Sequence, residues 1–169
     1  NLTLVDDKRA MNPQEIVVLR GSCRESASSN PVTRIFILSV QTGMVYRVPF
    51  DQPSGQSNDL MVDPAISADG EWIVALNSFN SPIIFFLYNT QTDSASSINY
   101  HFTNEVVGEV VWSPDGTQLA YIRSGQVWVA PFNQGQIDFA NEALLIDGTQ
   151  TMDIYYDMSW NSRGLIFTG

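Results

Sequence analysis

Residues 110–122 read VVWSPDGTQLAYI and give the clearest indication of the fold. Pro114, Asp115 and Gly116 form a tight-turn signature, because proline presets φ, aspartate bonds its own backbone and glycine accepts a positive φ. Apolar residues stand on both sides of the turn, and a second turn at residues 124–125 leads into QVWVA. The stretch therefore predicts three consecutive antiparallel β-strands.

The same frame recurs along the chain. Residues 65–75 read AISADGEWIVA, with Ile66 in the place of Trp112. Residues 159–167 read SWNSRGLIF and keep the Trp and the Gly but not the Pro-Asp pair. The weakest copy, NPQEIVVL at residues 12–19, resembles only the turn and the second strand. A repeat of roughly 40–50 residues is typical of β-propeller blades.

The copies divide the chain, read as one partial propeller over residues 1–169, into blades. The expected ranges are about 2–50 for blade one, 62–102 for blade two, 106–146 for blade three, and 154–169 for the beginning of blade four. Polar and small residues at 21–31 predict a loop inside blade one. Residues 2–5 are expected to serve either as the innermost strand of blade one or as an outer strand of the last blade.

The Trp-Ser-Pro-Asp-Gly element and the strands after it resemble the repeat of TolB-like, or WD-like, β-propellers. Residues 113–116 match that signature in full, and Ser67, Asp69 and Gly70 match it in part. The resemblance implies an all-β fold of four-stranded antiparallel blades, with about three and a half present. A propeller closes with about four to eight blades. We therefore expect an incomplete ring, or one that another chain, such as a second copy, closes.

The formal net charge of -10 argues against nucleic acid as a partner, because phosphate binding needs clustered Lys and Arg. The charge is uneven: residues 1–50 hold six bases and four acids, and residues 51–169 hold two bases and fourteen acids. No apolar run approaches the roughly 20 residues of a membrane span. The single lysine and the many Ser, Asn, Gln and Thr residues favour an exported protein, periplasmic or extracellular, and a first residue other than Met fits a processed or excised chain.

Catalytic and cysteine-based sites find little support in the sequence. His101 is the only histidine and has no partners that suggest a triad, and no Gly-x-Ser-x-Gly elbow is present. Cys23 is the only cysteine, so neither an intrachain disulfide nor a cysteine-based metal site is expected. Its alternative role is a disulfide to another chain. The chain alone is not expected to be an enzyme or to hold an organic cofactor.

Three acids recur at one position of the repeat, ahead of Ile66, Trp112 and Trp160: they are Asp63, Glu109 and Asp157. Each falls at the start of an expected innermost strand, which lines the channel of a propeller. Converging carboxylates there would hold Ca²⁺ or a basic peptide. The alternative is that these acids only cap the loops that enter the blades.

The tryptophans fall at comparable blade positions and are expected to pack between blades; they are Trp72, Trp112, Trp128 and Trp160. Their alternative role, stacking on sugars, requires exposed rings. The run IIFFLY at residues 83–88 is apolar on both faces of a strand, which fits a strand between two neighbouring blades.

These patterns favour a non-catalytic scaffold that binds a protein or peptide through its channel mouth and blade loops. The alternative is a propeller domain that gates access to a hydrolase or peptidase domain outside this sequence. A third reading is a carbohydrate-active propeller that uses Asp63 and Asp157 as paired carboxylates. Fold alone does not decide among these functions.

Overall fold

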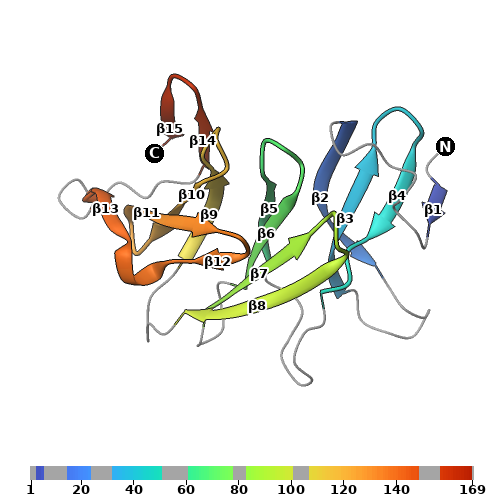
Figure 1. Ribbon diagram of the computed structural model, residues 1–169, viewed down its shortest axis with the longest axis horizontal. Helices are drawn as coiled ribbons and strands as arrows, with labels where there is room; N and C mark the ends of the chain where they lie inside the picture. The colour runs from blue at the N-terminus through green and yellow to red at the C-terminus, as the bar shows by residue number, and fades with distance from the viewer. Residues whose placement is uncertain are drawn as a thin grey trace.

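The computed structural model describes residues 3–5, 15–23, 32–50, 61–77, 83–100, 107–148 and 157–168. These ranges contain β-strands, the short 3-10 turn η2 (Phe139–Asn141) and no α-helix. The sheets stand side by side, with the first sheet at one end and β13 and β15 at the other (Figure 1). No helix in the described ranges has the length and hydropathy needed to span a membrane. The chain is a partial β-propeller, as predicted.

The first sheet has the order β1-β4-β3-β2. Its strands are β1 (Thr3–Val5), β2 (Ile16–Cys23), β3 (Val32–Ser39) and β4 (Met44–Arg47). β1 pairs in parallel with β4 at the sheet edge away from β2, so both roles expected for residues 2–5 are wrong as far as residues 3–5 are concerned. The physical reason is that the outer edge of β4 offers unpaired backbone groups, which β1 satisfies.

The second sheet has the order β5-β6-β7-β8, with each neighbouring pair antiparallel. Its strands are β5 (Met61–Ile66), β6 (Trp72–Asn77), β7 (Ile83–Asn89) and β8 (Ser94–Tyr100). Every residue of β7 is buried, which confirms that the run at 83–88 lies between two sheets. Phe86 and Tyr88 face the first sheet, whereas Phe85 and Leu87 face the third.

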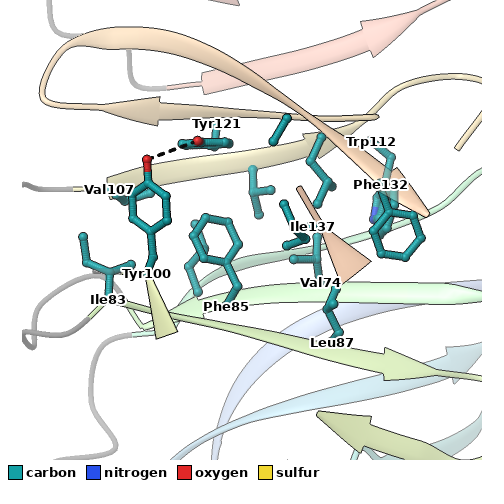
Figure 2. Packing of buried hydrophobic residues seen from close by; sticks show 14 residues of the cluster. Val74, Ile83, Phe85, Leu87, Tyr100, Val107, Trp112, Tyr121, Phe132 and Ile137 are labelled. Atoms are coloured by element: carbon teal, nitrogen blue, oxygen red, sulfur yellow. Dashed lines mark hydrogen bonds between the residues drawn. The ribbon is translucent and has the colours of Figure 1, made fainter. Parts of the chain in front are cut away.

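The third sheet has the order β12-β11-β10-β9, with β13 also paired to β11. Its strands are β9 (Val107–Trp112), β10 (Gln118–Arg123), β11 (Gln126–Asn133), β12 (Gln136–Ile137) and β13 (Ala143–Ile146). Phe85 of the second sheet packs with Tyr121 and Val107 of the third in a shared core (Figure 2). The second and third sheets therefore bury a continuous apolar layer between them.

The fourth sheet is the hairpin of β14 (Asp157–Asn161) and β15 (Gly164–Thr168). Met158 packs against Ile122 and Val127, which joins the hairpin to the third sheet. Several expected blade boundaries fall outside the described residues, so those boundaries stay predictions. β9 contacts both β5 and β14, so the first strands of the last three sheets are neighbours.

Two expectations about the tryptophans are confirmed by contacts between sheets. Trp112 Nε1 on β9 donates a hydrogen bond to the carbonyl oxygen of Ala65 on β5, at 3.1 Å. Trp72 of β6 packs edge-on against Phe132 of β11, with ring centroids 5.4 Å apart. A side chain at Gly135 would place its Cβ 2.7 Å from the Trp72 ring, and the φ of +82° there favours glycine. Glycine at position 135 therefore leaves room for the Trp72 ring between the sheets.

Candidate binding cleft and inner-strand acids

The repeated Ser-x-Asp-Gly turn is held by its own side chains. Ser113 Oγ donates to Asp115 Oδ1 at 2.6 Å and accepts from the Gln118 backbone N–H at 2.9 Å. Asp115 Oδ1 also accepts from the Thr117 backbone N–H, and these bonds, that from Ser113 first, lower the pKa of the Asp115 carboxyl from its usual 3.8. Gly116 supplies the positive φ of +71°. The motif is therefore a local structural device.

The second sheet repeats the same device. Ser67 Oγ donates to Asp69 Oδ1 at 2.6 Å and accepts from the Trp72 backbone N–H at 2.9 Å. The Glu71 backbone N–H donates to Asp69 Oδ1 at 2.9 Å. Ala68 takes the place of proline without changing these bonds, because Ser and Asp supply the hydrogen-bonding groups.

The fourth sheet builds its turn differently. Asn161 Oδ1 accepts from the Arg163 backbone N–H at 2.8 Å across the β14–β15 hairpin. Gly164 has a φ of +141°. Asn161 thus replaces the Ser-Asp pair with a single side chain, which explains why the turn survives without the Pro-Asp-Gly sequence.

A cleft of about 420 Å³ lies between the β9–β10 turn and the β14–β15 hairpin. We call it the turn–hairpin cleft, and its lining residues are Ser113, Pro114, Asp115, Gln118, Trp160, Asn161, Ser162, Arg163 and Gly164. Trp160 is half-buried and supplies an apolar wall, while Asp115 and Arg163 are exposed. The cleft therefore combines an indole, a carboxylate, a guanidinium and side-chain amides, which suits a polypeptide more than a purely apolar ligand.

Arg163 stands out because of its surroundings. It and Arg123 are the two bases of residues 51–169, against fourteen acids. Arg123 is buried and paired with Glu142. In the described part of the chain, the Arg163 guanidinium forms no ion pair with an acid. An exposed cation without such a partner, on an anionic chain and beside a tryptophan, is a favourable contact for a carboxylate of a ligand.

The inner-strand acids lie on the three neighbouring strands predicted for them: Asp63 on β5, Glu109 on β9 and Asp157 on β14. Glu109 is half-buried and Asp157 is exposed, whereas the Asp63 side chain is outside the described residues. No group of three or more His, Cys, Asp or Glu side chains within the described ranges is arranged to hold a metal. The Ca²⁺ or basic-peptide site therefore stays a prediction.

The backbone adds a detail about these acids that the repeat did not show. In β9, Val110 lies opposite Tyr121 and Gly108 opposite Ile122, so Glu109 is the extra residue of a β-bulge. In β5, the register also shifts between Val62 and Ala65, the interval that contains Asp63. A bulge redirects the side chain of its extra residue. Asp157, in contrast, pairs regularly with Thr168.

A buried polar cluster joins the second and third sheets and could not be predicted from the repeat. Glu142 accepts hydrogen bonds from Arg123 Nη1 at 2.6 Å and from Tyr100 Oη at 2.8 Å, and it also accepts one from Tyr121. Arg123 also donates to the Tyr100 hydroxyl, and its guanidinium carbon lies 3.6 Å from the centroid of the Trp128 ring. The one sequence signal is a base at the end of the otherwise apolar strand β10.

His101, also considered above, is outside the described residues.

Buried tyrosines should make the fold sensitive to alkaline pH. Burial raises the pKa of Tyr100 to about 12 and raises that of Tyr88 and Tyr121 above the usual 10.0. The unfolded chain releases these protons near its ordinary pKa, so the free energy of unfolding should hold below pH 10 and fall as pH rises toward 12. Denaturant unfolding at a series of pH values measures this fall.

The control for the tyrosine prediction is Tyr100→Phe, which removes one of the three titrating hydroxyls. The free energy of unfolding of this variant should fall less steeply between pH 10 and 12 than that of the wild type. The absorbance of the folded protein should show a fraction of tyrosines that ionises only well above the ordinary pKa of 10.0. Titration of all tyrosines together near pH 10 in the folded state would contradict the prediction.

Comparison with known proteins gives the fold and no family. No protein-family model matches the chain, and no curated protein sequence does. A chain in the complex of KlAtg21 with the coiled coil of AgAtg16 matches with a TM-score of 0.54 and 16% identity over 74% of this chain and 38% of its own. A protein from Lactobacillus plantarum matches with a TM-score of 0.55 and 13% identity, over 89% of this chain and 48% of its own.

TolB from Acinetobacter baumannii matches more weakly, with a TM-score of 0.48 and 12% identity, over 90% of this chain and 46% of its own. This chain thus spans 38–48% of the length of these three structures. At such identities, likeness to the first two establishes the propeller fold alone. The narrower TolB-like assignment stays a prediction.

Proposed function

We propose that this chain is a non-catalytic propeller scaffold that binds a protein or peptide, and that the turn–hairpin cleft is a contact site. The observation that carries the proposal is the position of Arg163, the exposed base of residues 61–168, beside Trp160 in a cleft with side-chain amides. A structure of similar fold, KlAtg21, forms a complex with the coiled coil of another protein. That complex supports a protein partner for this fold without identifying one here.

The proposal also concerns the protein to which this chain belongs and where that protein is located. We propose that it belongs to a larger exported bacterial protein, periplasmic or extracellular, on the basis of its acidic composition and single lysine. Its match to less than half of each similar structure is compatible with a part of a longer propeller. In this proposal the scaffold positions a protein partner and not a cofactor.

Phage-displayed random linear peptides, selected on the wild-type chain, test the cleft. Selected peptides should be enriched in Asp or Glu, and Arg163→Ala should weaken their binding by about tenfold, the loss of one charge-assisted contact of about 1.4 kcal/mol. The Trp160 indole N–H resonance should shift on titration with a selected peptide. Arg47→Ala, which removes an exposed arginine of the first sheet, is the matched control and should leave binding unchanged.

Two outcomes would contradict the cleft as the site. Peptides whose binding is insensitive to Arg163→Ala but lost in a variant with Glu109→Gln and Asp157→Asn would place binding at the inner-strand acids. Selection of no peptide, together with an unshifted Trp160 resonance in the presence of an Asp-rich peptide, would remove the support for peptide binding altogether.

A further inference from the structure

The second sheet ends in a long edge strand. β8 pairs with β7 on one side, and in the described part of the chain no strand pairs with its other side. β5, at the opposite edge of the sheet, contacts β2 and β9 of the neighbouring sheets, so β8 lies on the outer side of the molecule (Figure 1). Further blades of a longer propeller would pack on the faces of the sheets and leave this outer edge as it is.

Backbone hydrogen bonds show which residues of β8 point outward. The Thr90 N–H donates to the carbonyl oxygen of Glu71 at 2.7 Å, in the register that pairs β6 with β7. Hydrogen-bonded pairs alternate along an antiparallel ladder, so the even-numbered residues of β7 bond to β6 and the odd-numbered ones bond to β8. Ala95, Ser97 and Asn99 lie opposite even-numbered residues. Their N–H and C=O groups therefore point away from β7, and all three residues are exposed.

Edge strands are usually protected against pairing by charges, proline, bulges or short length, and β8 has none of these. Its sequence SASSINY at residues 94–100 contains no charged residue and no proline. All seven residues pair with β7 in one unbroken register. β13, at the edge of the third sheet, is different, because it has four residues and Leu145 is the extra residue of a β-bulge. β8 is thus a long, regular and uncharged edge.

The first sheet shows what such an edge accepts. The outer edge of β4 is occupied by β1, the uncharged segment TLV, which pairs with it in parallel. Leu4, the middle residue of β1, is 68% exposed, so burial of this side chain is not what holds the segment there. Backbone pairing of this kind requires an extended segment more than a particular sequence.

We propose that the outer edge of β8 is a second contact site for a protein partner, where an extended, uncharged segment of the partner adds to the second sheet as a further β-strand. The segment would exchange backbone hydrogen bonds with Ala95, Ser97 and Asn99. β8 offers no charged group to pair with a charged segment, and the net charge of -10 repels an acidic one. The edge shares no residue with the turn–hairpin cleft, so this site neither requires nor replaces the contact proposed there.

Random linear peptides displayed on phage and selected on the Arg163→Ala chain test the edge without the cation of the turn–hairpin cleft. Selected peptides should be enriched in Val, Ile, Thr and Tyr, with no preference for Asp or Glu. Ser97→Pro removes one outward N–H and keeps the bonds between β8 and β7, so it should weaken binding at least about tenfold. Ser97→Ala keeps that N–H and should bind as the unsubstituted edge does, because the hydroxyl takes no part in the proposed pairing.

Hydrogen exchange of the backbone amides measures the pairing directly, and it serves equally if the proline variant does not fold. Addition of a selected peptide should slow the exchange of the Ala95, Ser97 and Asn99 amides at least about tenfold. The amides of Ser96 and Ile98 already point toward β7, so their exchange should change little.

Three results would overturn the strand-addition site: equal slowing of both sets of amides, binding that a folded Ser97→Pro chain retains, or binding that Ser97→Ala abolishes. Selection of no peptide on the Arg163→Ala chain would overturn it as well. Acidic peptides selected on the wild-type chain would in that case still support the turn–hairpin cleft, so the two proposals fail separately.

Discussion

Replacing Glu142 with alanine should lower the free energy of unfolding by about 3–5 kcal/mol, the range for removing one partner of a buried ion pair. Glu142 is the acceptor for Arg123, Tyr100 and Tyr121, and both side chains of the ion pair are about nine-tenths buried. Without the carboxylate, Arg123 keeps its charge where its side chain is about nine-tenths buried. Chemical denaturation followed by tryptophan fluorescence measures the loss.

The same substitution should also loosen the contact between the second and third sheets. Tyr100 is the last residue of β8, while Arg123 and Tyr121 lie on β10, so Glu142 holds groups from both sheets. Asp147→Ala is the matched control, because Asp147 is an exposed acid that accepts a hydrogen bond from Gln126. Its effect should be within about 0.5 kcal/mol.

A second variant keeps the Glu142 prediction testable if the alanine variant does not fold. Arg123→Leu combined with Glu142→Leu removes both charges and should be more stable than Glu142→Ala, because no buried charge is left without its partner. A loss of less than about 1 kcal/mol for Glu142→Ala would show that water reaches Arg123 and that the cluster contributes little.

Local hydrogen bonding explains which parts of the fold were predictable. The Ser-x-Asp-Gly turns are closed by bonds between residues two to five positions apart, such as Ser113 to Asp115, so the sequence carries their whole determinant. The apolar run of β7 likewise indicated its burial by composition. These elements were predicted correctly because no distant residue is needed to define them.

Long-range pairing explains what was missed. The placement of residues 3–5 depends on the free edge of β4, about forty residues away along the chain, and no feature of TLV indicates it. The ion pair of Arg123 and Glu142 follows from the position of β13 against β11. The turn–hairpin cleft joins two turns from different repeats, and although the repeat identified both turns, it does not show that they lie together.

Replacing Phe85 with alanine should lower the free energy of unfolding by about 3–5 kcal/mol, the range for deleting a buried aromatic side chain. Phe85 is fully buried on β7, and its ring centroid lies 5.8 Å from that of Tyr100 and 5.6 Å from that of Tyr121 (Figure 2). The ring centroid of Phe139 lies 5.0 Å from that of Phe85. Alanine would leave a cavity at the centre of the layer between the second and third sheets.

The width of the thermal unfolding transition tests the packing between the second and third sheets as strongly as the midpoint of the transition does. Because Phe85 of the second sheet packs against Tyr121 of the third sheet, Phe85→Ala should reduce the coupling between the two sheets and broaden the thermal transition. Phe85→Leu retains much of the volume and should cost roughly half as much. If Phe85→Ala and Phe85→Leu had equal, small effects and left a single sharp transition, the two sheets would have to be coupled elsewhere, and the Glu142 cluster would be the remaining candidate.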